Sequence, residues 1–308
     1  NHMIKISIII FFLLLKCLPA IAEIEIKFKI DDNIITNIDI INERKYLIFL
    51  RPNLNKLSEN EIEKISIDTL IRDIIKKKEI DKVFTKQPSD NFIKKIKNNL
   101  YNYKKVKNES EFINLLKENN IKYDKIIEKI KYEALWNDLV YRKFNSLVKI
   151  DKRLLKDQLK TKLANNKKYE YNLSELLFEI GQNESLELKY REINKFINLT
   201  DFKTAAIKYS ISGSSSRGGE IGWIKETLLS NKLINLLKQV KINEVTKPIK
   251  YPNGFLILKV NEKKEMKQII DINKELEELV KFERNKQLNQ FSLLYYKKLK
   301  QNTSINEY

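Results

Sequence analysis

The sequence predicts an α+β multidomain protein in which a mainly helical domain is interrupted by a second, α+β domain. Apolar residues recur at helical spacing over much of residues 37–149, and this period returns from Asp271 to about Lys300. Between the two regions, residues 168–262 hold strand-like segments together with the glycines of the chain, which mark turns. The order helical, mixed, helical therefore predicts one discontinuous domain with another inserted into it.

The first 22 residues have the pattern of a secretory signal peptide. Lys5 gives the basic start, Ile6–Leu15 form the apolar run, and Ala20–Ala22 form a small-x-small cleavage site. A membrane anchor is the alternative, but a spanning helix needs about 18 or more apolar residues, and Lys16 interrupts the run. We therefore expect residues 1–22 to be a cleavable signal peptide that exports the chain.

The extreme N-terminus also holds the only histidine, His2, and the only cysteine, Cys17. Asn1 and His2 precede Met3 and are interpreted as a cloning remnant, and a lysine before Cys17 disfavours a lipoprotein anchor there. Zinc sites, Cys-His pairs and Ser-His-Asp triads need side chains that the rest of the chain lacks. The glycines also do not follow the spacing of phosphate or dinucleotide loops. We therefore expect no metal and no small-molecule cofactor.

Lysine and arginine number 59 and aspartate and glutamate 41, so the formal net charge is +18. Such an excess favours an acidic or anionic partner. The lysines, however, are spread over all the predicted helices, as on a solvated face, and the predicted signal peptide directs the chain away from nucleic acid. A nucleic-acid partner is therefore not expected.

The mature chain is predicted to open with a hairpin. Residues 24–30 alternate between apolar and charged side chains, as in a half-buried strand, and residues 31–33 supply turn chemistry. Thr36 with Asp39 resembles a capping box and predicts a helix start. Pro52 is expected to stop this helix.

Further helices follow in the first half of the chain. Ser58 with Glu61 repeats the capping pattern and predicts a second amphipathic helix. Periodic apolar residues predict helices at residues 90–106, 109–118 and 122–149. Residues 151–166 are more polar and are interpreted as a helical connector. Such apolar stripes are usually packed in a core, and a ligand surface is the alternative.

The segment Tyr209–Ile224 resembles the signature of parvulin-type peptidyl-prolyl isomerase domains, which is roughly Y-S-x-D, a few small residues, then G-G-x-[LI]-G-W. Residues 173–178 resemble the first parvulin strand, residues 201–210 the helix before the signature, and residues 245–260 the closing strand. The match covers about residues 168–262 in the expected order. The resemblance implies an antiparallel sheet with helices.

The surroundings of this segment resemble the SurA family, periplasmic chaperones of Gram-negative bacteria. Residues 30–40 are similar to the V-N-x-x-[IV]-[IV]-[TL]-x-x-[DE]-[IV] pattern near the start of that family. The resemblance implies a helical chaperone domain at residues 23–167, to which residues 263–308 return as a C-terminal helix. This chain differs from the best-known members in carrying one parvulin domain instead of two.

The positions that carry catalysis in active parvulins are substituted. Those enzymes surround the proline with two histidines and a Cys or Asp, and the matching positions here are Glu175, Leu256 and about Ser212. Leu256 cannot form a hydrogen bond, Ser212 carries no charge, and Glu175 is no isostere of histidine. No catalytic residue is therefore assigned, and isomerase activity is expected to be weak or absent.

The apolar wall of the parvulin proline pocket falls at about Leu229 and Leu233. Both are apolar, so the resemblance implies that a peptide could dock there without being isomerised. The alternative is that both are ordinary core residues of a helix predicted over residues 227–237. Gly218, Gly219 and Gly222 are interpreted as structural, because tight turns with positive φ favour glycine.

These inferences predict a periplasmic, ATP-independent chaperone that holds unfolded outer-membrane protein segments, with the assembly machinery of the outer membrane as a further partner. An exposed apolar surface would serve extended clients and needs no nucleotide chemistry. The enzyme alternative is an active peptidyl-prolyl cis-trans isomerase that assists the folding of exported proteins.

Overall fold

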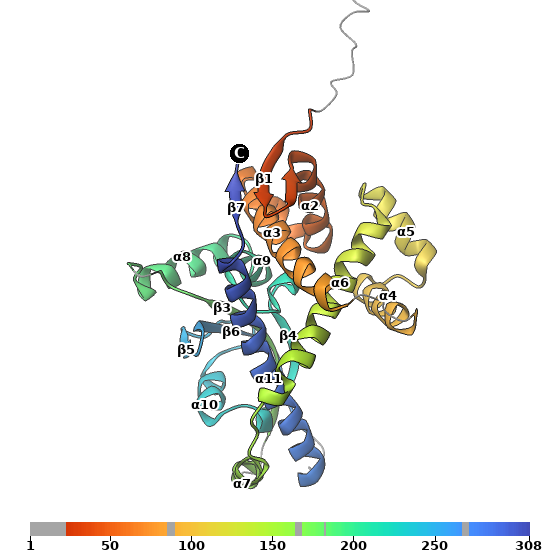
Figure 1. Ribbon diagram of the computed structural model, residues 1–308. Helices are drawn as coiled ribbons and strands as arrows, with labels where there is room; N and C mark the ends of the chain where they lie inside the picture. Colours follow the sequence, from red (N-terminus) through yellow and green to blue (C-terminus); the bar gives the residue numbers. More distant parts are fainter. Residues whose placement is uncertain (1–22, 85–89, 164–167, 182, 267–270) are drawn as a thin grey trace, which may run out of the picture.

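The computed structural model describes residues 23–308, with gaps at 85–89, 164–167, 182 and 267–270 (Figure 1). The predicted signal peptide, residues 1–22, lies outside this part of the chain. The described chain forms a helical region and a mixed α+β region, so the predicted α+β multidomain class is confirmed. No helix in these ranges is long and apolar enough to cross a membrane.

A small antiparallel sheet brings the beginning and the end of the described chain together. β1 (Ile26–Ile30) and β2 (Asn33–Thr36) form the predicted hairpin. β7 (Ile305–Glu307), which the sequence did not reveal, pairs with the other edge of β1. The order β2-β1-β7 places the last strand beside the first (Figure 1).

Two capping boxes start the first helices, as predicted. The Thr36 side chain accepts a hydrogen bond from the Asp39 amide, and Asp39 Oδ2 accepts one from the Thr36 amide at 2.9 Å. The resulting helix is α2 (Asn37–Leu50), and the 3-10 turn η1 (Pro52–Lys56) follows it. Ser58 and Glu61 form the same reciprocal pair at the start of α3 (Glu59–Val83). Each box satisfies backbone donors that a helix start leaves free.

The remaining helices before the insert are α4 (Asp90–Lys104), α5 (Glu109–Glu118), α6 (Tyr123–Phe144), the turn η2 (Asn145–Leu147) and α7 (Lys152–Leu163). α4 and α5 agree with the predicted helices to within a few residues. The helix predicted over residues 122–149 ends earlier, at Phe144, where η2 follows, and the end predicted at residue 166 lies outside the described residues. Their apolar stripes are packed in cores, and one such cluster consists of Phe49, Leu100, Tyr101, Phe112, Leu116 and Ile126.

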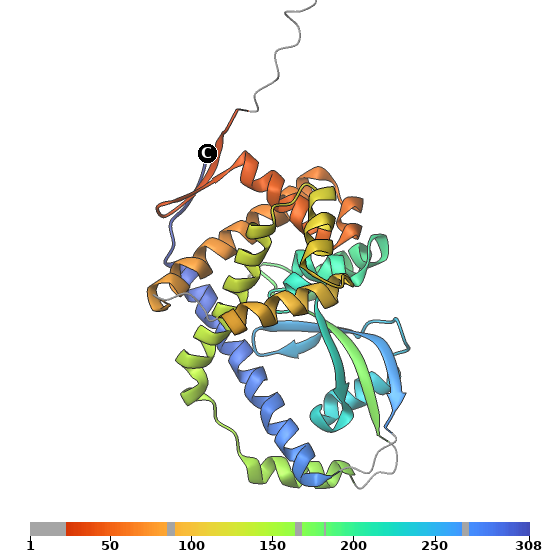
Figure 2. The same cartoon turned by 90° about the vertical axis from the view of Figure 1, so that its right-hand side faces the viewer.

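The C-terminal helix α11 (Ile272–Gln301) returns to the helical region and packs against α3, α6 and α7 (Figure 2). The Trp136 ring of α6 stacks on Tyr295 with the ring centroids 5.6 Å apart. The Trp136 Nε1 donates a hydrogen bond to Ser292 at 2.9 Å. This packing confirms the predicted return of the last helix.

A buried ionic cluster joins α2, α3 and α6. Lys129 Nζ lies 2.9 Å from Glu43 Oε2 and also pairs with Asp73. Glu43 is only 3% exposed. Burial raises the pKa of Glu43, and the positive charge of Lys129 opposes that rise. Lys129 therefore compensates the buried Glu43 and the partly exposed Asp73.

The insert is built on a four-stranded antiparallel sheet of order β4-β3-β6-β5. Its strands are β3 (Tyr169–Phe178), β4 (Glu220–Lys225), β5 (Ile249–Tyr251) and β6 (Gly254–Glu265). β6 is longer than the strand predicted at residues 255–260, because it pairs with β3 along its whole length as far as Glu265 opposite Tyr169.

Helices cover both faces of this sheet. α8 (Leu186–Leu199) and α9 (Phe202–Tyr209) pack on one face, in a cluster with Leu176, Phe178 and Ile257. The other face, formed by Tyr171, Leu173, Leu177, Leu256, Leu258 and Val260, packs against α10 (Asn231–Gln239). The helix predicted over residues 227–237 begins later, at Asn231, because the Ser230 side chain caps it; Thr227 lies in the preceding 3-10 turn η4 (Glu226–Leu228).

The insert also contacts the N-terminal helices through α9. Lys208 forms an ion pair with Glu61 of α3 at 2.5 Å, and Asn53 of η1 donates a hydrogen bond to Asp201. Ile207 packs against an apolar cluster of α2, η1 and α3 that includes Leu54. The insert is therefore held by polar and apolar contacts on this side.

Candidate peptide-binding site

A chain of serine hydroxyls connects Glu175 to the end of β3. Ser214 Oγ donates a hydrogen bond to Glu175 Oε1 at 2.8 Å, and the Ser214 and Ser212 hydroxyls lie 2.8 Å apart. Ser212 Oγ lies 2.9 Å from Ser210 Oγ, which accepts a hydrogen bond from the Leu177 amide at 3.0 Å. The loop after α9 is thus bonded to β3 at two points, through Ser214 to Glu175 and through Ser210 to Leu177.

A glycine allows the loop to approach Glu175 this closely. Gly219 has φ +76°, and a Cβ added to it would lie 2.1 Å from the Glu175 carbonyl oxygen. The Glu175 amide donates to the Gly219 carbonyl at 2.8 Å, and the Gly219 amide donates to the Ser214 carbonyl at 2.9 Å. Gly219 is therefore structural, as predicted, because a residue with a Cβ atom would not fit this conformation or this contact.

The electrostatics of Glu175 follow from its position on the sheet. Burial raises its pKa, while hydrogen bonds from Ser214 and Ser212 and the charge of Arg217 oppose the rise. Burial also raises the pKa of Tyr251 on β5, and the nearby Glu175 carboxylate adds to that effect. Glu175 is a hydrogen-bond acceptor whose Oε1 is already occupied by the loop.

The other two positions that the resemblance aligns with parvulin catalytic residues offer no charge. Ser212 is the middle member of the hydroxyl chain, and its hydroxyl contacts Ser210 and Ser214. Leu256 on β6 pairs with Leu177 of β3 and is buried in the apolar face. The arrangement therefore supplies a hydrogen-bonded carboxyl, a hydroxyl and an apolar surface, and none of these three positions carries a cation.

The two residues expected to contact a peptide lie in different environments. Leu229, which follows η4, is only 4% exposed and belongs to the core cluster of the sheet face. Leu233 on α10 is partly exposed and packs against the same cluster. Leu229 thus has a core position, and peptide contact through Leu233 stays a prediction.

The helix α11 closes over this face of the insert, which the sequence did not reveal. Phe282 and Leu293 pack against the cluster that contains Leu229 and Leu256. These contacts join residues far apart in the sequence, and no local pattern marks them. The face that would bind a proline peptide is consequently shared with the chain's own helix.

An ionic network fixes the N-terminal half of α11 to the insert. Lys225 of β4 forms an ion pair with Glu275 at 2.9 Å and a second one with Glu278. The Thr227 hydroxyl also donates a hydrogen bond to Glu275, which is 3% exposed. A buried carboxylate needs such partners.

The residues that the structure describes contain no group of three His, Cys, Asp or Glu side chains arranged to hold a metal ion. The hydroxyls and backbone amides near Glu175 are hydrogen-bonded to one another.

Comparison with known proteins agrees with this architecture. Residues 179–262 match the rotamase family, described as the PPIC-type PPIase domain. This range includes Ser212, Leu229, Leu233 and Leu256, whereas Glu175 lies just before it.

The relatives include proteins named Chaperone SurA. The chain is 27% identical over 295 residues to the one from Buchnera aphidicola subsp. Schizaphis graminum, covering 89% of this chain and 67% of that protein. It is 26% identical over 162 residues to the one from Pseudomonas putida, covering 50% of this chain but only 38% of that protein. A solved structure of SurA-like chaperones from Campylobacter jejuni covers 92% of this chain and 98% of its own, at 15% identity and a TM-score of 0.37.

Fold and site together define a two-part protein, in which a parvulin-type domain is inserted into a helical domain that the last helix completes. The chain is similar to Chaperone SurA over most of its length, and residues 179–262 match the PPIC-type PPIase domain.

Proposed function

We propose that this protein is an ATP-independent periplasmic chaperone that holds unfolded outer-membrane proteins. We propose also that its parvulin domain has weak isomerase activity or no isomerase activity. The proposal includes delivery of clients to the assembly machinery of the outer membrane. It divides the chain into a chaperone domain at residues 23–167, the insert at about 168–262, and the returning helix in residues 263–308.

The observation that carries the proposal is the extent of the similarity to Chaperone SurA. It runs over 295 residues and so includes the helical region as well as the parvulin domain. A parvulin enzyme alone would account only for residues 179–262. The similarity outside the isomerase domain supports a role for the helices themselves.

The helical region also exposes apolar side chains on elements that pack together. Val83 at the end of α3, Tyr141 on α6, Leu147 in η2 and Leu294 on α11 are each about half exposed. The same elements surround the core cluster that contains Ile80, Leu135, Trp136, Leu139, Val140 and Leu288. Exposed apolar side chains of this kind suit an extended, aromatic-rich client.

The parvulin site supports the second half of the proposal. Twisting a prolyl amide has a barrier of about 20 kcal/mol, and an enzyme lowers it with polar groups aimed at the reacting bond. Here Leu256 is apolar and Glu175 Oε1 already accepts the Ser214 hydrogen bond. The match to the PPIC-type PPIase domain supports the alternative that the protein is an active peptidyl-prolyl isomerase.

The test uses the intact chain from residue 23 to residue 308. Its ability to prevent aggregation of a urea-unfolded outer-membrane β-barrel protein on dilution is measured without ATP, and a proline-peptide isomerisation assay is performed on the same sample. We expect protection of the client and little isomerisation. Fast isomerisation without protection would replace the proposal by the enzyme alternative.

A further inference from the structure

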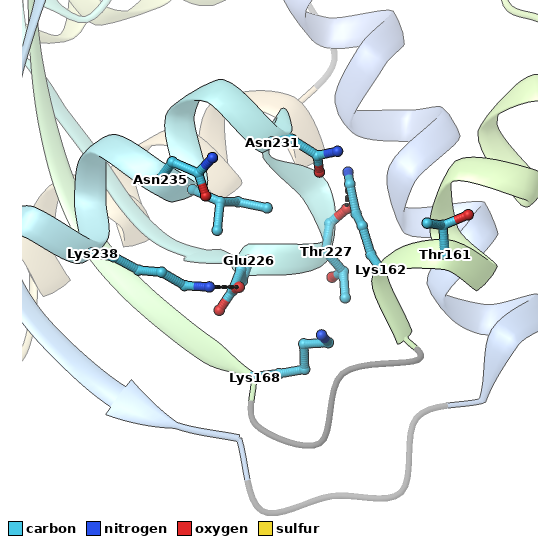
Figure 3. A pocket seen from close by; sticks show the side chains of 9 residues that line it. Thr161, Lys162, Lys168, Glu226, Thr227, Asn231, Asn235 and Lys238 are labelled. Atoms are coloured by element: carbon cyan, nitrogen blue, oxygen red, sulfur yellow. Dashed lines mark hydrogen bonds and ion pairs between the residues drawn. The ribbon is translucent and has the colours of Figure 1, made fainter.

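A polar pocket of about 230 Å³ lies between α7 and the start of the insert (Figure 3). None of Glu175, Ser212, Leu229, Leu233 and Leu256 is among the residues that line it. Its lining is formed by Thr161, Lys162, Lys168, Glu226, Thr227, Asn231, Ile234, Asn235 and Lys238. The volume is sufficient for several waters or a small anion.

Lys168 is the unusual member of this pocket. Its residue is only 7% exposed, and its side chain is directed into the pocket beneath Glu226 and Thr227 (Figure 3). The backbone around it is fixed, because the Met266 amide donates to the Lys168 carbonyl at 2.8 Å. Among the described residues, no hydrogen bond or ion pair of its ammonium group is found. The ammonium group is not one of the fully buried polar atoms without a partner in the described residues, so it faces the space of the pocket and not a dry interior.

The single carboxylate in the pocket is already engaged. Glu226 Oε2 accepts a hydrogen bond from the Tyr169 amide at 3.1 Å, and Glu226 Oε1 lies 3.5 Å from Lys238 Nζ. It is therefore paired with a cation other than Lys168.

A second cation adds to the charge of Lys168. Lys162 Nζ donates hydrogen bonds to the Thr227 and Leu229 carbonyls at 3.0 and 2.7 Å. These neutral partners hold the ammonium group of Lys162 in place. Burial lowers the pKa of Lys162, and the nearby carboxylates of Glu283 and Glu226 oppose that change. The pocket consequently has three lysines and one carboxylate, which leaves an excess of positive charge.

Neutral donors of the same pocket come from α10. Asn231 and Asn235 are one turn apart on this helix and both line the pocket. Asn231 is also the first residue of α10, where free backbone amides and the helix dipole favour an anion. Cations and side-chain amides thus line the same space.

We propose that this pocket binds a compact oxyanion, a carboxylate or phosphate group, with Lys168 as its main cationic contact. Lysine ammonium groups act as point charges that suit one or two anionic oxygens. An oxyanion there would neutralise Lys168 and accept hydrogen bonds from Asn231 and Asn235. Because Lys162 belongs to α7 and the other donors to the insert, the bound anion would also strengthen the contact between the two.

The test is titration of the intact protein with inorganic phosphate, and separately with acetate, by calorimetry at constant ionic strength maintained with chloride. Lys168→Met keeps the length of the side chain and removes its charge. Lys232→Met is the matched control, because Lys232 is exposed on α10 and does not line the pocket. We expect the phosphate dissociation constant to rise about tenfold or more in K168M and to stay unchanged in K232M.

Thermal unfolding in anion-poor buffer gives a second readout. Removal of one of the three positive charges that share the pocket should raise the midpoint in K168M, because like charges repel, whereas K232M should leave it unchanged. Phosphate should then raise the midpoint of the wild-type protein and of K232M but not that of K168M.

A pair of short peptides distinguishes the sources of the anion. Tighter binding of a peptide with a free C-terminal carboxylate than of its amidated form identifies a polypeptide carboxylate, and equal weak binding of both peptides, with phosphate binding retained, identifies a free anion. The proposal is overturned if neither phosphate nor acetate nor the free-carboxylate peptide binds, if binding is the same in K168M, or if K168M unfolds at a lower temperature in anion-poor buffer.

Discussion

Ser214 Oγ donates a hydrogen bond to Glu175 Oε1 at 2.8 Å, and this contact ties the loop after α9 to the central strand of the parvulin-type sheet. The resemblance to parvulins places Glu175 where the active enzymes have a histidine. The carboxyl of Glu175 thus holds the loop. Burial raises the pKa of this carboxyl.

Glu175→Gln is expected to stabilise the protein at neutral and alkaline pH. Burial raises the pKa of Glu175 in the folded state, so the folded chain retains this proton more readily than the unfolded chain. The stabilising contribution is full below the unfolded pKa, near 4.3, and is lost as pH rises through the folded pKa. Glutamine can still accept the Ser214 hydrogen bond but carries no charge.

Urea unfolding of E175Q and wild type between pH 4 and 8 checks this expectation. The stability advantage of E175Q should grow with pH over that range. Glu118→Gln, at an exposed position on α5, is the control and should change little. An E175Q protein that is less stable than wild type at pH 8 would contradict the assignment.

Lys225→Met should loosen α11 from the insert. It removes the cation paired with the buried Glu275 and with Glu278. Loss of hydrogen bonds to charged groups costs about 1.5–3 kcal/mol, which denaturant unfolding can measure. Lys250→Met, at an exposed position on β5, provides the matched control. Equal stability of the two variants would show that the network does not hold α11.

Lys129→Met should destabilise the helical region strongly. The change leaves Glu43 and Asp73 without their shared cation inside the protein. Removing one partner of a buried ionic group costs about 3–5 kcal/mol. Lys125→Met on the same helix removes only an exposed pair with Glu128 and should cost about 1 kcal/mol or less. The prediction fails if urea unfolding gives similar values for both variants.

Exposed apolar residues of the helical region should be required for client protection. The combined change Tyr141→Ser, Leu147→Ser and Leu294→Ser should remove most of the protection and leave unfolding nearly unchanged, because these side chains are about half exposed. Aggregation of an unfolded outer-membrane protein, followed by light scattering, is the measurement.

The control for this triple variant lies in the insert. Leu188→Ser and Leu199→Ser remove two exposed leucines from α8. We expect full protection from this control. Loss of protection in the control alone would locate client binding on the parvulin domain instead.

The local elements could be predicted from the sequence because their signals are local. Thr36 and Ser58 each lie three residues before an acidic partner, and both form the predicted capping boxes. Helical periodicity likewise revealed α11, whose return to the N-terminal helices followed from the SurA resemblance and is confirmed by the Trp136–Tyr295 stack.

The long-range contacts had no such signal. β7 has only three residues, too few for an alternating pattern, and it forms by pairing with β1. The pair between Lys225 and Glu275 joins residues fifty positions apart, in a chain where charged residues are common. At the candidate site, sequence comparison indicated Glu175 and Ser212, but only the fold shows that Ser214 donates the hydrogen bond to Glu175.

The central claim is that the helical region performs the chaperone function, and removal of the insert tests it most directly. Tyr169 and Glu265 pair across the sheet, so residues 169–265 can be replaced by a short linker that joins neighbouring ends. The shortened chain is first shown by circular dichroism to unfold cooperatively. Its protection of an unfolded outer-membrane β-barrel protein is then compared with that of the intact chain. We predict that protection is largely retained; a folded variant that no longer protects would contradict the claim.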